Sequence, residues 1–370
     1  MLSYKKNWGV SNFFVTLFIV SGVIAEDLLA IIKILVSKKY FTEADYNLAL
    51  SKQNFGHYDK PEKISIKATK MKGKALSILS HIRYFGLIIN RVPCLDEKVL
   101  SEDSFKLAIT LSRLTEKLMA PIIRHFEVLN LEEETVSYLD ARAVIHDKYP
   151  NLMNRPKPKH HFGSHYAEAV QKYGPCLGVW TARYESKNRV AKSLAVSGKN
   201  FINISKTVAV RQQFRQASVY FRGFFAREKK VLPQKVKHKS DILEEVSPVE
   251  SAVKPFMDND SLLCGEVSIC QQNYKTNDVV VLAVESSDSI VVGLVMAVLY
   301  KDDECFFVVH KYQALRNDSF CYFETVDFDE NLYFIRSNCL VDYKPLVMIG
   351  VAQKFKFALH HHLSVNCSDL

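Results

Sequence analysis

The sequence has no pair of cysteines at the C-x-x-C spacing that zinc-binding modules use. None of its eight cysteines lies near a second cysteine and histidines at zinc-finger spacing; they occupy positions 94, 176, 264, 270, 305, 321, 339 and 367. We therefore expect reduced thiols in an intracellular protein. The thirteen glycines form neither a P-loop nor a dinucleotide-binding fingerprint. These absences argue against a zinc finger and against the common nucleotide-binding motifs.

The N-terminal region lacks an uninterrupted apolar run of the roughly 18 to 20 residues that a membrane-spanning helix needs. Two lysines do precede an apolar stretch at residues 10–25, and Val23 and Ala25 suit a signal-peptidase site, so a secretory signal is one interpretation. The other interpretation is a packing helix, because the apolar character resumes at residues 27–36 with helical spacing. That spacing is set by Leu28, Ile31, Ile32 and Leu35.

Positive charge is concentrated in one part of the chain. Residues 151–240 contain nineteen Lys and Arg against three acids, whereas the whole chain has a net charge of +9. The remainder is therefore negative. A local excess of this kind predicts a surface for polyanions, with nucleic acid as the first partner to test. The alternative is a solvated basic face that binds nothing.

Helical periodicity dominates the first two thirds of the chain. We predict helices at residues 26–40, 72–90, 104–129, 131–149 and 205–228. Pro121 should kink or divide the third of these. In the last one, Val210, Phe214, Ala217, Phe221 and Phe225 would form one apolar stripe, with Arg211, Arg215 and Arg222 on its flank. The arginines would either grip phosphates or border a buried face.

The composition changes after Arg227. Residues 229–260 contain three prolines, dense charge and no apolar period, which predicts a mobile linker between two domains. Residues 261–355 contain five or six short β-branched or aromatic segments, which predict a small antiparallel barrel or sandwich. Residues 356–370, with histidines at 360, 361 and 362, are expected to form an unstructured tail.

The stretch KPKHHFGSH at residues 157–165 raises the question of a metal site. His161 and His165 are four residues apart, the spacing at which two imidazoles on one helix can share a zinc ion. We predict no metal site, because no cysteine or acid stands beside them at ligand spacing and Gly163 would interrupt the helix. The histidines would instead pack or hydrogen-bond this segment.

The same stretch begins a series of landmarks that resembles the C-terminal part of CACTA-type (En/Spm-like) transposases, in the version found in animal transposon-derived proteins. The resemblance covers residues 24 to 350 loosely and is most specific in the middle. Its matching residues are Lys157, Pro158, Lys159, His160, His161, Phe162, His165, Tyr166, Gly174, Pro175, Trp180, Arg183, Tyr184, Glu185, Lys187, Asn200, Phe201, Ile204, Lys206, Thr207, Ala209, Arg211 and Gln213. Departures from the family pattern are Gly163, Ser164, Ala167, Asn188 and Gln212.

The resemblance implies an RNase H-like nuclease, in which acidic side chains hold two divalent metal ions. The resemblance makes Glu185 the candidate for the third catalytic carboxylate; the alternative role for Glu185 is a buried salt bridge with Arg183 or Lys187. The first two acidic positions of the family lie in an upstream domain for which this chain has no room. We therefore expect no cofactor and no nuclease activity for the isolated chain, and Mg²⁺ or Mn²⁺ only if other chains complete the site.

Taken together, the sequence predicts an α+β protein with a helical transposase-like domain at residues 24–228, preceded by a non-family segment at 1–23. The helical part would be a remnant of the RNase H-like region. We expect weak, non-specific nucleic-acid binding in the nucleus or cytoplasm, possible association with other transposase chains and no stable membrane anchor. The expected phosphate contacts are Lys157, Lys159, Arg183, Lys187, Arg189, Arg211, Arg215 and Arg222. A transposase completed in trans and a secreted protein are the alternatives.

Overall fold

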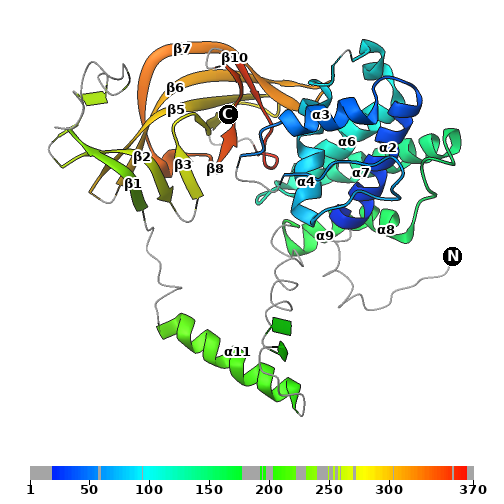
Figure 1. The fold of residues 1–370 in the computed structure, drawn as a ribbon, viewed down its shortest axis with the longest axis horizontal. Helices are drawn as coiled ribbons and strands as arrows, with labels where there is room; N and C mark the ends of the chain where they lie inside the picture. The colour runs from blue at the N-terminus through cyan, green and yellow to red at the C-terminus, as the bar shows by residue number, and fades with distance from the viewer. Residues whose placement is uncertain are drawn as a thin grey trace.

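The structure is a computed structural model in which a helical N-terminal part packs beside a C-terminal antiparallel sheet, so the predicted α+β class is confirmed (Figure 1). It describes residues 19–56, 60–93, 95–176, 192–193, 195–196, 203–221, 231–239, 249, 253–254, 257–258, 260–269, 272–302, 304–351 and 354–364. Structural statements below refer to these residues.

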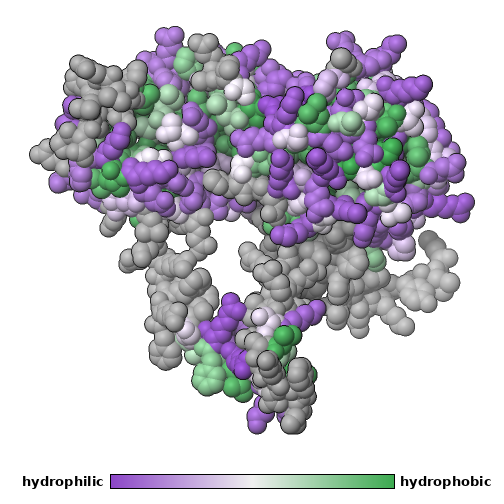
Figure 2. Space-filling model, in the orientation of Figure 1, coloured by the Kyte–Doolittle hydropathy of each residue, from purple (hydrophilic) through white to green (hydrophobic). Residues whose placement is uncertain are grey.

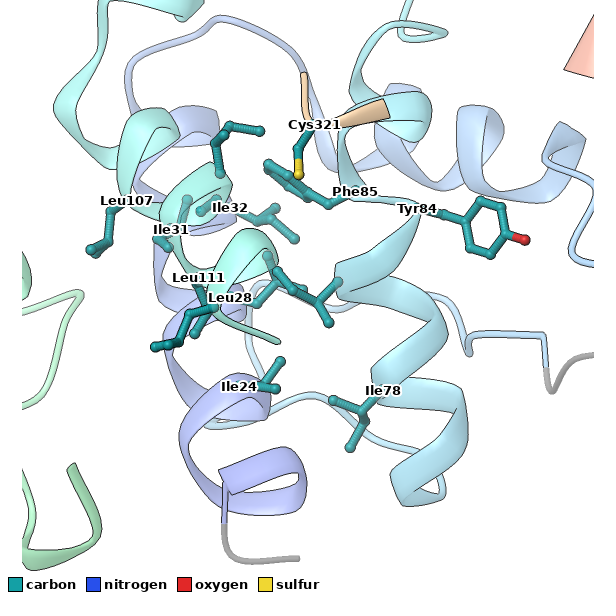
Figure 3. Close-up of a cluster of buried hydrophobic side chains, with 14 of the residues drawn as sticks. Ile24, Leu28, Ile31, Ile32, Ile78, Tyr84, Phe85, Leu107, Leu111 and Cys321 are labelled. Atoms are coloured by element: carbon teal, nitrogen blue, oxygen red, sulfur yellow. The ribbon is translucent and has the colours of Figure 1, made fainter. Parts of the chain in front are cut away.

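The helical part is built around α2, whose apolar residues recur at helical spacing and are almost completely buried. Its elements are a π-helical turn at Ile19–Ile24, α2 (Ala25–Ser37), α3 (Glu43–Lys52), α4 (Ala75–Arg83), α5 (Phe85–Ile89), α6 (Asp103–Leu118), α7 (His125–Lys148), α8 (Pro158–His161) and α9 (Tyr166–Tyr173). Leu28, Ile31 and Ile32 of α2 lie between α4 and α6 in the core (Figure 3). The packing-helix interpretation of residues 27–36 is thus confirmed.

Pro121 divides the predicted third helix, as expected: α6 ends at Leu118 and α7 begins at His125. The predicted boundary near Asn130 is wrong, because α7, which is 24 residues long, runs through it from His125 to Lys148. No glycine or proline stands there to end the helix. Farther along, α11 (Ile204–Phe221) confirms the predicted helix at 205–228 over its described part.

The C-terminal part is one ten-stranded antiparallel sheet that stays open, so the predicted barrel is wrong. Its strands are β1 (Val231–His238), β2 (Leu262–Ile269), β3 (Gln272–Lys275), β4 (Asp278–Val284), β5 (Ser289–Lys301), β6 (Glu304–Asn317), β7 (Tyr322–Arg336), β8 (Asp342–Val347), β9 (Ile349–Val351) and β10 (Lys354–Phe357). The order is β1-β2-β5-β6-β7-β10-β9, while β3 pairs with β2, and β4 pairs with both β5 and β8. Register shifts in β5, β6 and β7 mark bulges, which bend strands without closing the sheet.

Two predictions about the ends of this sheet are wrong. The expected linker contains β1, which pairs with β2 from Val231 opposite Ile269 to His238 opposite Leu262. The expected tail contributes the last two residues of β10, and most residues after it as far as position 363 are buried, among them Leu359 and Leu363 in the core of the sheet. His360 and His361 are almost completely buried, so a histidine tract here is part of the core. The polar composition of these two segments predicted a lack of structure. In the fold, their residues pair with or pack against segments that are distant in the sequence.

The helical part and the sheet share one hydrophobic core, in which Cys321 and Tyr322 from the sheet lie among the helices. The two parts approach closely at Gly86 of α5, where an added Cβ atom would lie 1.6 Å from the carbonyl oxygen of Phe320. Beside it, the Arg316 guanidinium forms a buried ion pair with Glu116 at 2.8 Å. The segment after β10 adds a hydrogen bond of 2.6 Å from Arg83 to the carbonyl oxygen of His360. The interface therefore combines apolar packing with an ion pair and a hydrogen bond, and at Gly86 it has no room for an added methyl group.

We predict that Gly86→Ala lowers the free energy of unfolding by at least about 2 kcal/mol, because the added methyl group must displace the backbone of Phe320. Urea unfolding measures this. Gly163→Ala is the matched control, since its Cβ would meet Thr135 at 3.4 Å, an ordinary contact distance. Equal stability of the Gly86 variant and the wild type would contradict this interface.

Three buried histidines make a second prediction, on pH. Burial lowers the pKa of His81 to about 3 and that of His361 to about 4, and it lowers the pKa of His360 well below its usual value. The unfolded chain binds these protons near pH 6.5, whereas the folded chain does not. The free energy of unfolding therefore keeps the whole contribution of these histidines above that pH. Each histidine should remove about 1.4 kcal/mol per pH unit as the pH falls from about 6.5 toward its folded pKa.

The measurement is urea unfolding at several pH values between 7.5 and 5. His361→Gln should reduce the loss of unfolding free energy by about 1.4 kcal/mol per pH unit, the contribution of one proton, since glutamine does not titrate. A stability that stays constant from pH 6.5 to 5 would show that these histidines are not buried in neutral form.

Candidate functional site: the histidine-lysine segment and helix α11

The structure describes four of the predicted site residues and leaves the others outside the described residues. Lys157 and Lys159 lie at the start of α8, and Arg211 and Arg215 lie on α11. The predicted residues that fall outside are Arg183, Glu185, Lys187, Arg189 and Arg222. The two described pairs belong to separate regions, which follow in turn.

Lys157 and Lys159 are both held by Glu26 in the first turn of α2. Each Nζ atom lies 2.7 Å from a different oxygen of this carboxylate. Burial raises the pKa of Glu26, but the hydrogen bonds from the two lysines outweigh it and hold the pKa below its usual value. These lysines therefore anchor the segment to α2. The single negative charge of Glu26 offsets one of their two positive charges.

The neighbouring Asp27 is the centre of a buried polar cluster that the sequence did not reveal. Arg142 of α7 donates to both carboxylate oxygens, at 2.8 and 3.0 Å, and Tyr138 donates to one of them. His160 Nε2 lies 3.3 Å from Asp27 Oδ2. Burial alone would raise the pKa of Asp27, but hydrogen bonds from His160 and Arg142 lower it overall. The carboxylate is thus charged and fully surrounded by donors.

His160 faces Asp27 as a positioned donor. Its Nδ1 accepts a hydrogen bond of 3.0 Å from the backbone N–H of Lys157, so Nδ1 carries no proton. The proton therefore sits on Nε2, which points at Asp27. Both ring nitrogens are engaged within the protein, and the predicted packing role of the histidines is confirmed for His160. This Asp-His pair is a structural tie and has no free nitrogen for acid-base chemistry.

The cavity beside this cluster is too small for a substrate. It measures about 20 Å³, room for one or two waters, and is lined by Val23, Leu111, Leu114, Thr135, His160 and Tyr166, among others. The described residues also bring no three His, Cys, Asp or Glu side chains together at a possible metal site.

His161 and His165 lie on the exposed side of the same segment. The α-helix is interrupted at Gly163, as predicted: α8 ends at His161, a 3₁₀ turn spans Phe162–His165, and α9 begins at Tyr166. Gly163 is buried in this turn, where an added Cβ atom would lie 3.4 Å from Thr135. The two Nε2 atoms lie 3.4 Å apart, with the rings almost perpendicular. The two imidazoles therefore meet across the interrupted helix, although the sequence predicted that the interruption would prevent their pairing.

Helix α11 stands apart from the helical part and the sheet (Figure 1). Its apolar stripe is not covered by described residues: the exposed fraction of Phe214 is 73% and that of Val210 is 39%. Lys206 and Arg215 are exposed as well, and the described part of the helix contains no acid. Hydrophobic and hydrophilic side chains accordingly lie together on its surface (Figure 2). The alternative of arginines beside a buried face is not what the described structure shows.

The possible signal-peptidase residues Val23 and Ala25 are buried, and both belong to the core around α2. Cleavage after Ala25 would remove Val23 and Ile24 from that core. Among the described helices, none has the length and apolar character required to cross a bilayer.

Comparison with protein-family models, with curated proteins and with solved structures finds no match for this chain. The resemblance to CACTA-type transposases stays a prediction that rests on the motif residues. Of these, the KPKHHF segment lies on α8 and its flanks, and the WTARYESK segment lies outside the described residues.

The Asp27 cluster makes a prediction on stability. Asp27→Asn should lower the free energy of unfolding by about 3–5 kcal/mol, because it leaves the buried guanidinium of Arg142 without its counter-charge. Asp318→Asn, which breaks an exposed pair with Arg113, should cost about 0–1 kcal/mol and serves as the control. Urea unfolding compares the two. Similar costs for both variants would contradict the central position of Asp27.

Proposed function

We propose that this chain binds nucleic acid weakly and without sequence preference through the basic region at residues 151–240, with α11 as its main described contact element. The observation that carries the proposal is the position of α11, which stands away from the body and exposes Lys206 and Arg215 in a helix without acids. A cationic helix of this kind contacts phosphates without reading bases.

The described structure supports α11 over the lysines of α8. Lys157 and Lys159 share the carboxylate of Glu26, so they have less positive charge to offer to a phosphate. Two further lysines, Lys235 and Lys237, are exposed on β1, the strand that follows α11 in the described chain. Lys206 and Arg215 of α11 and Lys235 of β1 thus contribute exposed positive charge to the basic region.

The proposal also covers catalytic activity. We propose that the isolated chain does not cleave DNA and acts in the nucleus or cytoplasm as a transposon-derived binding protein. In the alternative, Glu185 joins carboxylates of another transposase chain around Mg²⁺ or Mn²⁺. That alternative requires metal-dependent plasmid cleavage in the presence of a partner chain, abolished by Glu185→Gln.

The binding proposal is tested by the salt dependence of affinity for a short DNA duplex. On duplex DNA each phosphate contact contributes about −0.9 to the slope of log K against log salt. Replacing Lys206, Arg211 and Arg215 together by glutamine should therefore make the slope shallower by up to about 2.7 and weaken binding.

The matched control is a triple Gln variant of Lys63, Lys67 and Lys70, which are exposed residues in another basic stretch, on the helical part. It removes the same charge from a different surface. If the two triple variants lose affinity equally, the interaction reflects net charge alone and α11 is not the contact element. If the wild-type chain does not bind the duplex at low salt, the proposed function fails.

A further inference from the structure

Two exposed histidines meet on the segment that joins α8 to α9. The rings of His161 and His165 have centroids 5.0 Å apart and an interplanar angle of 87°. Their Nε2 atoms lie 3.4 Å apart and face each other. Both residues are exposed, whereas the adjacent His160 is buried and engaged through both ring nitrogens.

This nitrogen separation matches the distance between two imidazole ligands of one metal ion. Zinc binds histidine at about 2.0–2.1 Å in tetrahedral geometry, which places two ligand nitrogens roughly 3.3–3.4 Å apart. We propose that His161 and His165 form a two-histidine site for a divalent transition metal of the zinc class, with water in the remaining coordination positions.

The surrounding structure holds the two ligands in place. His161 lies at the end of α8, one turn before His165, and its carbonyl oxygen accepts a hydrogen bond of 2.7 Å from the Ser164 hydroxyl. The segment is attached to α2 by two contacts: His160 lies against Asp27, and Lys159 forms an ion pair with Glu26. The backbone that presents the two imidazoles is therefore preorganised, which reduces the entropy cost of binding a metal.

A carboxylate stands where an outer partner of a metal-bound histidine is expected. Glu168, one turn further along α9, has its Oε2 atom 4.0 Å from Nδ1 of His165. Metal-bound histidines almost always donate their second ring N–H to such a group, which fixes the tautomer and raises the basicity of the ligand. At 4.0 Å the carboxylate lies beyond hydrogen-bonding distance, and rotation of the exposed Glu168 side chain would bring it within reach of Nδ1 of His165.

The chemistry of the pair selects the metal. Imidazole nitrogens suit Zn²⁺, Cu²⁺, Ni²⁺ and Co²⁺, whereas Mg²⁺ and Mn²⁺ prefer oxygen ligands. The site is thus distinct from the carboxylate metal site that the transposase resemblance implies, and it does not depend on the proposed nucleic-acid binding. Two protein ligands leave the ion open to water or to an oxygen or nitrogen atom of a bound molecule.

The test is a titration of the full chain, selectively labelled with ¹⁵N-histidine, with Zn²⁺ under reducing conditions that keep Cys339 from oxidising. We expect saturable shifts of the ring nitrogens of His161 and His165 at one equivalent of metal. His165→Gln should weaken Zn²⁺ binding at His161 by at least about tenfold, the lower end of what losing even an outer partner costs. Glu168→Gln should weaken it less.

The matched control is His125→Gln, because His125 is an exposed histidine on α7 outside this pair. It should leave the Zn²⁺ affinity of the pair unchanged. Mg²⁺ should produce no shift. Zinc-induced shifts confined to other histidines, or an affinity at His161 that is unchanged in the His165→Gln variant, would overturn the proposed site.

Discussion

The constraint on which the helical part depends is the burial of one carboxylate, that of Asp27. A charged group inside a protein is tolerated only when charge and hydrogen bonds surround it. Arg142 and Tyr138 of α7 and His160 of α8 supply these partners, so α7 and α8 must both meet the first turn of α2. Neighbouring Glu26 repeats the principle nearer the surface by holding two lysines. One short acidic turn thereby fixes the position of a whole segment.

This anchoring divides the KPKHHFGSH segment into two sides with different roles. Lys157, Lys159 and His160 face α2 and serve the fold. His161 and His165 face solvent with their Nε2 atoms directed at each other. Part of the charge that the sequence assigns to nucleic-acid binding is therefore used for folding, and the exposed cations of α11 and β1 form the surface that we propose for contact with nucleic acid. Residue type alone does not distinguish a folding role from a binding role, but the interaction partner of each side chain in the structure does.

Local patterns predicted much of the fold. The helical period of α2 and the break at Pro121 follow from chemistry within a few residues. The predicted barrel failed because closure of a sheet depends on register and bulges across strands far apart in the chain. The buried tail failed for a similar reason, since His362 has its partner Glu127 at a separation of 235 residues. Asp27 and Arg142 are 115 residues apart, and no period of the sequence connects them. Gly163 interrupts the α-helix as predicted, but the 3₁₀ turn that replaces it still brings His161 and His165 together, which helix periodicity alone does not predict.

Hydrogen–deuterium exchange, followed peptide by peptide in the wild type and in the Asp27→Asn variant, tests the anchoring of this segment most directly. Loss of the Asp27 anchor should open residues 157–173 by local unfolding, so their amides should exchange faster than in the wild type. Peptides of the sheet core, such as those from β5 and β6, should keep their protection under conditions in which the variant remains folded. Unchanged protection of residues 157–173 in that variant, or a loss spread evenly over the whole chain, would contradict the account.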